Sequence, residues 1–89
     1  MRSENSNAAL AQEIIRKYIL ENISIPSLDD DFDIFEAGIV NSLFAIELMT
    51  FLEKSFSIKV TMDDLDMQNF KSVNAASQFV QKKKEGKSA

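Results

Sequence analysis

The chain contains no cysteine and no histidine. Without cysteine it can form neither disulfide bonds nor thiolate metal sites. Without histidine it lacks the commonest general base and metal ligand, and any Ser-His-Asp triad is excluded. Catalysis would depend on carboxylates, lysines and hydroxyls alone, and no carboxylate pair stands in a context that predicts a catalytic pocket. We therefore expect a protein that is not an enzyme and holds no metal.

Proline and glycine are also scarce, with one and two residues respectively among 89. Hydrophobic residues make up 45% of the chain, which is enough for one small core. No apolar run approaches the roughly 20 residues of a membrane-spanning helix, and residues 1–10 lack the hydrophobic centre of a signal peptide. The composition predicts a single soluble domain in the cytoplasm, which we expect to be a monomer.

Positive charge is sparse in the middle of the chain. Between Glu21 and Asp66 there are eleven acidic residues and two lysines, whereas the part after Asp66 holds five lysines and one glutamate. An acidic surface repels nucleic acids and anionic lipids and favours basic protein partners. We therefore expect neither nucleic acid nor membrane as a partner. The alternative, that the acids only keep a small domain soluble, stays open on charge alone.

Hydrophobic residues recur with helical spacing in three segments, residues 7–22, 42–56 and 72–82. Pro26 prevents the first helix from continuing. Thr61 is followed three residues later by an acid, which is the spacing of a capping box and predicts a short additional helix. No segment predicts a strand. The expected fold is all-α, a four-helix bundle with three main helices, a short third helix and a long first loop.

The large apolar residues of these segments predict the core, which we expect to contain Ile14, Tyr18, Phe35, Leu48, Leu52, Phe56 and Phe79. Residues 23–41 form a long connection that is rich in apolar residues, so we expect it to pack along the helices. Gly38 permits a turn before the second long helix. A further apolar set on that helix, Leu43, Phe44 and Ile46, cannot share one buried face with the core stripe and is expected to be exposed.

The acidic residues of the long connection suggest a calcium hypothesis. Asp29, Asp31 and Asp33 match positions one, three and five of an EF-hand loop. Ile34 and Val40 stand where that loop needs a glycine and a bidentate glutamate. A solvated acidic loop is therefore the better interpretation, with a small calcium-responsive protein as the weaker alternative.

Ser42 has the most distinctive context. A serine at the start of a helix is usually only an N-cap, and Asn41 is an equally good cap. A helix N-terminus also offers free N–H groups and the positive end of the helix dipole, which favour a phosphodiester. Ser42 is therefore a candidate attachment point for a phosphate-linked group.

The residues around Ser42 resemble the phosphopantetheine-attachment motif of acyl and peptidyl carrier proteins. The family pattern has a glycine, two or three residues, Asp-Ser-Leu, then Glu-Leu and a Leu-Glu-x-x-Phe ending. The matching residues are Phe35–Leu43, Glu47, Leu48, Leu52–Phe56, Asn69–Val73 and Phe79-Val80. The resemblance covers residues 8–82, so we place a carrier domain at 7–82, between a flexible N-terminus (1–6) and a flexible basic tail (83–89).

The resemblance implies a covalent 4'-phosphopantetheine arm on Ser42. A phosphopantetheinyl transferase would install it from coenzyme A, and the arm would supply the thiol that the chain lacks. An acyl- or aminoacyl-activating enzyme or an acyltransferase would load the arm with a thioester for downstream synthase or tailoring enzymes. These enzymes would read a surface that we expect to contain Leu43, Phe44, Ile46, Glu47, Met62 and Asp63, so Phe44→Asp should weaken docking and leave the fold intact.

Two departures from the family pattern bear on the pathway. Asn41 stands where aspartate is usual, and Phe44 stands where many fatty-acid carriers have an acid. With these two residues the motif resembles stand-alone carriers of secondary metabolism more than fatty-acid carriers. Such stand-alone carriers include those on which unusual malonyl-type extender units are built for polyketide assembly. The alternative is a non-modified helical protein-interaction module, whose activity would not change in Ser42→Ala.

Overall fold

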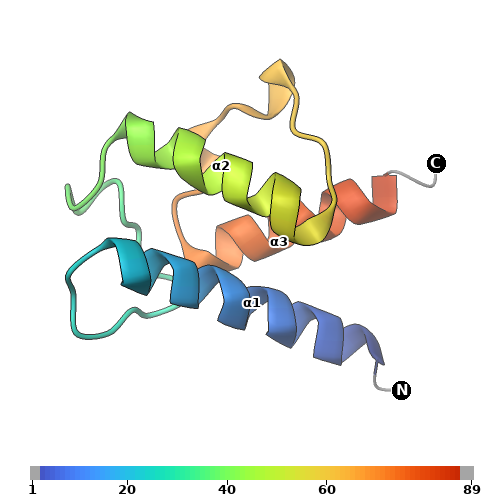
Figure 1. The fold of residues 1–89 in the computed structure, drawn as a ribbon, viewed down its shortest axis with the longest axis horizontal. Helices are drawn as coiled ribbons and strands as arrows, with labels where there is room; N and C mark the ends of the chain where they lie inside the picture. Colours follow the sequence, from blue (N-terminus) through green and yellow to red (C-terminus); the bar gives the residue numbers. More distant parts are fainter. Residues whose placement is uncertain (1–2, 87–89) are drawn as a thin grey trace.

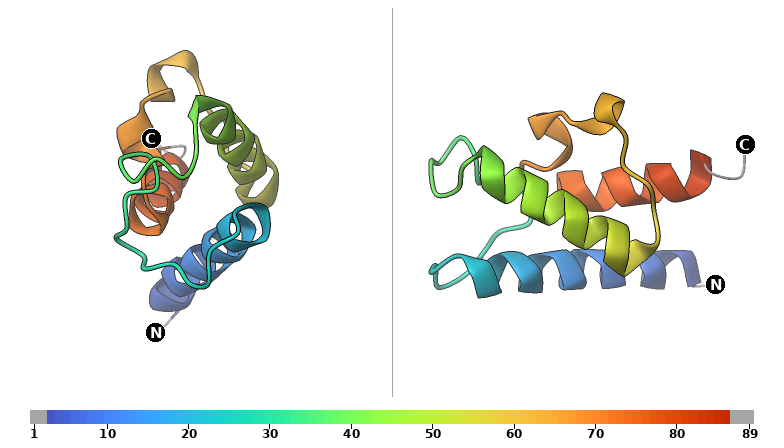
Figure 2. Two further views of the ribbon diagram at one scale, coloured as in Figure 1. Left: turned by 90° about the vertical axis from the view of Figure 1, so that its left-hand side faces the viewer. Right: turned by 45° about the horizontal axis from the view of Figure 1, so that its top comes forward.

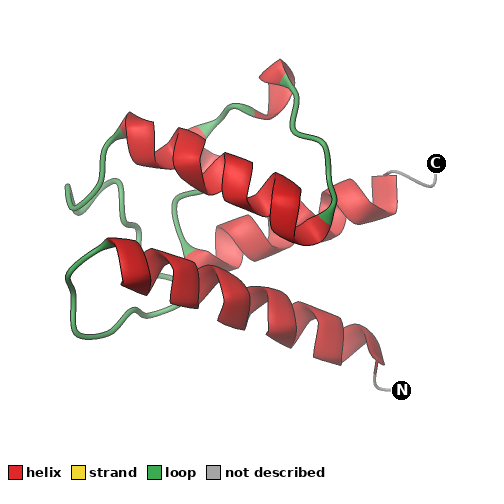
Figure 3. Ribbon diagram, viewed as in Figure 1, coloured by secondary structure: helices red, strands yellow, loops and turns green. Residues whose placement is uncertain are grey.

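The computed structural model describes residues 3–86, which form three α-helices: α1 (Ser3–Asn22), α2 (Ser42–Phe56) and α3 (Val73–Gly86). Two single 3₁₀ turns, η1 (Met62–Asp64) and η2 (Met67–Asn69), lie between α2 and α3. α1 runs in the opposite direction to α2 and α3 (Figure 1). No strand occurs among residues 3–86, and the predicted all-helical class is confirmed (Figure 3).

The predicted short third helix is replaced by η1 and η2. Asp66, in an extended conformation with φ −133° and ψ 125°, separates the two turns. The Asp64 carboxylate accepts hydrogen bonds from Thr61 N–H at 2.9 Å and Thr61 Oγ1 at 3.1 Å. The expected pairing of Thr61 with the acid three residues later is therefore present, but it opens only a turn. Neither turn holds a buried residue, so no apolar stripe stabilises a longer helix.

The first and last helices are longer than the sequence predicted. We expected residues 3–6 in a flexible N-terminus, but α1 begins at Ser3. Neither proline nor glycine occurs in this segment to interrupt the helix. α3 continues through Gly86, beyond the predicted start of the basic tail at residue 83. Lys83 forms an ion pair with Asp64, which favours an ordered helix at this point. The remaining residues of the expected flexible N-terminus and basic tail, 1–2 and 87–89, lie outside the described part of the chain.

The core forms where the three helices meet the long connection, and the predicted core positions Leu48, Leu52 and Phe79 are buried. Tyr18, Phe35 and Phe56 are partly buried and pack against this core. The full buried cluster is Ile15, Ile19, Leu28, Ile34, Phe44, Leu48, Leu52, Ile58, Phe70, Val73, Ala76, Phe79 and Val80.

The prediction that Ile14 belongs to the core is wrong, since its side chain is 37% exposed. Among residues 9–22 of α1, whose side chains the structure describes, the buried ones are Ala11, Ile15 and Ile19, which repeat every four residues. Successive residues of a helix are about 100° apart around its axis, so a stripe through Ile15 leaves Ile14 at the edge of the buried face.

The long connection of residues 23–41 is packed along the helices, as predicted. Ile34 is fully buried, and its N–H donates to the carbonyl oxygen of Lys71 at 2.8 Å. Arg16 of α1 donates two hydrogen bonds to the Asp30 carboxylate, at 2.8 and 2.9 Å. The connection is thereby fixed to α1 and to the entry of α3, and it leads the chain to the start of α2 (Figure 2).

Candidate functional site

Ser42 lies in the first turn of α2 with a free side chain. Asn41 is the N-cap, because its Oδ1 accepts the Phe44 N–H at 3.1 Å. Ser42 is exposed, and its hydroxyl makes no hydrogen bond with any other residue in the described part of the chain. Of the two cap candidates in the sequence, the structure therefore selects Asn41 and leaves the Ser42 hydroxyl available for modification.

The start of α2 also presents unused hydrogen-bond donors. The backbone N–H groups of Ser42 and Leu43 have no partner among residues 3–86, as the geometry of a helix end dictates. The first turn of α2 contains no acidic residue, so the positive end of the helix dipole is not neutralised within that turn. A phosphodiester on the Ser42 oxygen would lie beside these N–H groups, which is a favourable position for an anion.

Gly38 supplies the turn that precedes Ser42. Its φ is +78°, and its N–H donates to the carbonyl oxygen of Phe35 at 3.0 Å. A Cβ at this position would meet nothing within 4 Å, so the backbone conformation rather than space favours glycine. The predicted turn at Gly38 is confirmed.

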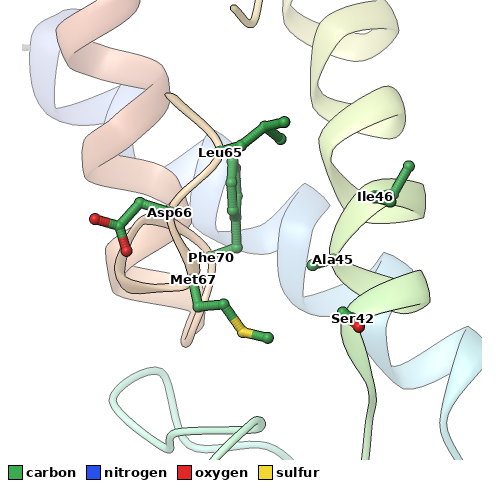
Figure 4. Close-up of a pocket in the computed structure, with 7 residues that line it drawn as sticks. All are labelled: Ser42, Ala45, Ile46, Leu65, Asp66, Met67 and Phe70. Atoms are coloured by element: carbon green, nitrogen blue, oxygen red, sulfur yellow. The ribbon is translucent and has the colours of Figure 1, made fainter. Parts of the chain in front are cut away.

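An apolar pocket of about 200 Å³ opens directly beside Ser42 (Figure 4). Its two sides come from the first turns of α2 and from the chain around η2, and its lining residues are Ser42, Ala45, Ile46, Leu65, Asp66, Met67 and Phe70. The Met67 side chain extends towards Ser42, whereas the Asp66 carboxylate points away from the opening. None of the lining residues presents a charge to the pocket, which suits an apolar ligand.

Most of the predicted partner-binding residues lie on the surface, and one of them, Ile46, lines this pocket. Leu43 is 61% exposed, Ile46 50% and Met62 83%, and both Glu47 and Asp63 are exposed. Their exposure makes them available to a partner.

The pocket wall also contains Leu65 and Met67, which the sequence analysis missed. They are 49% and 42% exposed. The only sequence signal for them was their apolar character next to Asp66, without helical or strand spacing.

The expectation that Phe44 is exposed is wrong. Its side chain is 8% exposed, and its ring lies 6.1 Å from that of Tyr18, which in turn stacks on Phe51 at 4.0 Å. Phe44 continues the buried stripe of Leu48 and Leu52 at intervals of four residues. Phe44→Asp would therefore place an unpaired carboxylate in the core and would not leave the fold intact.

The acidic residues of the long connection make contacts within the chain. Asp31 Oδ1 accepts a hydrogen bond from Asn74 Nδ2 at 2.6 Å, and Asp33 Oδ1 accepts the N–H groups of Phe35 and Glu36 at 3.0 and 2.9 Å. Within residues 3–86 no group of three or more potential ligands is arranged to hold a metal ion. The calcium hypothesis therefore finds no support.

None of the described helices combines the length and hydrophobicity that crossing a bilayer requires.

A family model described as "Phosphopantetheine attachment site" matches residues 13–80, a range that contains Ser42 and the pocket. Several similar proteins are named D-alanyl carrier protein. The one from Lactococcus lactis subsp. lactis is 37% identical over 57 residues, or 64% of this chain and 72% of that protein. The one from Streptococcus pyogenes serotype M5 is 30% identical over 69 residues, or 78% of this chain and 84% of that protein.

Proposed function

The chain belongs to the phosphopantetheine-attachment family of carrier proteins, and from this premise we propose that Ser42 is the residue that bears its 4'-phosphopantetheine arm. A member of this family is a carrier and not an enzyme, and its prosthetic group is covalently attached. The single observation that carries the assignment to Ser42 is its exposed, unbonded hydroxyl at the start of α2, beside free backbone N–H groups.

In the attachment step the Ser42 oxygen would form a bond to the phosphorus that bears the pantetheine group of coenzyme A. The pyrophosphate bond breaks, adenosine 3',5'-bisphosphate leaves, and the hydroxyl proton passes to the phosphopantetheinyl transferase. The N–H groups of Ser42 and Leu43 would then stabilise the phosphodiester. Ser42 is in this account an attachment point, and loading of the arm is the work of acyl-activating enzymes.

The partner enzymes would dock on the exposed residues around Ser42. The apolar part of this surface is Leu43, Ile46 and Met62, and the acidic part is Glu47 and Asp63. Acidic side chains at the rim steer a basic partner into place, and a small apolar contact keeps the complex short-lived. Brief encounters of this kind suit a carrier that visits several enzymes in turn.

For the cargo we propose a small acyl group, held as a thioester, in secondary metabolism. The resemblance of the Val40–Phe44 string to stand-alone carriers supports a malonyl-type extender unit for polyketide assembly. The second candidate is an aminoacyl group such as D-alanine, which is favoured by the names of the similar proteins.

The cargo is tested by recovering the protein from cells that produce it and measuring the mass of the loaded arm. A carboxylated, malonyl-type group would support the first proposal, and a D-alanyl group would replace it with the second. A chain that carries no arm, and whose cellular activity survives Ser42→Ala, would overturn both in favour of a non-modified interaction module.

A further inference from the structure

Asn41 uses only one side of its carboxamide to cap α2. Its Oδ1 accepts the Phe44 N–H at 3.1 Å, and because an amide nitrogen is no acceptor, the cap fixes which of the two side-chain atoms faces the helix. The other atom, Nδ2, makes no hydrogen bond with any residue in the part of the chain that the structure describes, and Asn41 is exposed. The residue directly before Ser42 therefore offers free N–H donors to a partner.

An aspartate at this position would present the opposite chemistry. One carboxylate oxygen would cap the helix in the same way, and the second, an anionic acceptor, would take the place of Nδ2. A partner enzyme can pair such an oxygen with a cation of its own. Against the asparagine of this chain, the same cation would face N–H donors and would lose its partner, which weakens binding.

The helix that follows Asn41 adds to this difference. The first turn of α2 contains no acidic residue, so neither the N-cap nor that turn neutralises the positive end of the helix dipole. The exposed acids of the proposed docking surface, Glu47 and Asp63, lie further along the chain. The surface therefore combines a centre beside Ser42 that attracts hydrogen-bond acceptors with acidic groups that attract a basic partner.

We propose that Asn41 is a specificity-determining residue, whose Nδ2 selects partner enzymes that present an acceptor, a carboxylate or carbonyl oxygen, beside Ser42. The inference rests on the proposed function of Ser42, since the first partner to meet this surface is the phosphopantetheinyl transferase. An enzyme that presents an arginine or lysine at the same point would suit an aspartate, and it binds this chain less well. The carrier is thereby kept apart from enzymes that serve carriers with the usual Asp-Ser-Leu pattern.

The test compares arm attachment to the full-length wild type and to two variants at Asn41. The transferase comes from cells that produce this protein, and kcat and KM are obtained from the rate at which the intact mass increases. Asn41→Gly removes the donor, adds no charge and keeps a residue that is favourable as an N-cap. We expect it to raise KM about tenfold and to leave kcat unchanged, because a hydrogen bond that holds the partner is lost. Asn41→Asp should raise KM further, about thirtyfold, because its carboxylate faces the acceptor of the partner.

Stability and overall charge are controlled separately. A role in capping alone does not produce the expected result, because aspartate suits the positive end of the dipole and should stabilise the fold while attachment becomes weaker. Gln78→Glu makes the same change from carboxamide to carboxylate on an exposed residue of α3, and it should leave KM unchanged. Relative to wild type at the same salt concentration, added salt should reduce the loss in Asn41→Asp, which is partly a charge effect, and should preserve the loss in Asn41→Gly.

Each outcome has a separate meaning. If Asn41→Gly has the KM of wild type, or if Asn41→Asp is modified as well as wild type or better, the partner does not use the Nδ2 donor and the inference is overturned. If Gln78→Glu raises KM as much as Asn41→Asp does, the effect is one of overall charge, and the inference is again wrong. If the wild-type chain gains no arm at all, the proposed function of Ser42 fails, and the inference fails with it.

Discussion

The ring of Phe44 packs against that of Tyr18, with the ring centres 6.1 Å apart and the planes inclined by 26°. This contact places Phe44 at the interface between α1 and α2. The side chain of its neighbour Leu43 is 61% exposed. Two adjacent apolar residues at the start of α2 therefore have different roles. Phe44 contributes to stability, and Leu43 is available to partners.

The stability of the two alanine variants should differ accordingly. Phe44→Ala removes a large buried side chain and should lower the free energy of unfolding by about 3 kcal/mol. Leu43→Ala removes an exposed side chain and should change it by less than about 0.5 kcal/mol. Urea denaturation of the two variants measures the difference, and equal losses would contradict the assignment of Phe44 to the core.

Docking should depend on Leu43 more than on exposed leucines elsewhere. Leu43→Asp introduces a charge where an apolar contact is proposed, and it should lower kcat/KM for arm attachment by about tenfold, or about 1.4 kcal/mol of transition-state binding. Leu10→Asp is the control, since Leu10 is 53% exposed on α1. Similar losses of kcat/KM in both variants would argue against a docking surface around Ser42.

The N-cap at Asn41 should tolerate aspartate but not alanine. Asn41→Ala removes the acceptor for the Phe44 N–H and should destabilise the unmodified chain by about 1 kcal/mol. Asn41→Asp keeps an acceptor and adds a negative charge at the helix N-terminus, which should increase stability by about 0.5 kcal/mol. Thermal unfolding of the unmodified proteins tests both, and a less stable Asn41→Asp protein would show that the cap works differently.

Acid should weaken the contribution of Asp64. The hydrogen bond from Lys83, followed by that from the Thr61 backbone, holds the pKa of Asp64 below its ordinary value. A carboxyl with a lower pKa in the folded than in the unfolded chain binds fewer protons when folded, so its contribution is complete above the ordinary aspartate pKa and is lost as the pH falls through the folded pKa.

The stability difference between wild type and Asp64→Asn should therefore be largest near neutral pH and should shrink below about pH 4. Urea denaturation at a series of pH values measures it. A difference that stays constant down to about pH 3 would mean that the Asp64 carboxylate gains nothing from Lys83.

The sequence predicted best those features that depend on local pattern. The start of α2 and the turn at Gly38 each follow from a few neighbouring residues, and the cap of α2 was narrowed to Asn41 and Ser42. The family resemblance likewise rests on residue spacing around Ser42.

The features that the sequence did not predict depend on contacts between elements. Phe44 and Leu43 are both apolar neighbours, and Phe44 is the one that lies in line with Leu48 and Leu52 and packs against Tyr18 of α1. The pocket wall was missed because Leu65 and Met67 lie in an irregular segment without helical or strand spacing, and only the folded chain brings this segment opposite Ala45 and Ile46 of α2.

The most direct test of the account is the intact mass of the protein before and after incubation with coenzyme A and a phosphopantetheinyl transferase. We expect wild type and Ser55→Ala, which changes another exposed serine of α2, to gain the mass of one phosphopantetheine. Ser42→Ala should gain none. Absence of any gain in the folded wild-type protein with several transferases, or an equal gain in Ser42→Ala, would contradict the assignment of Ser42 as the attachment site.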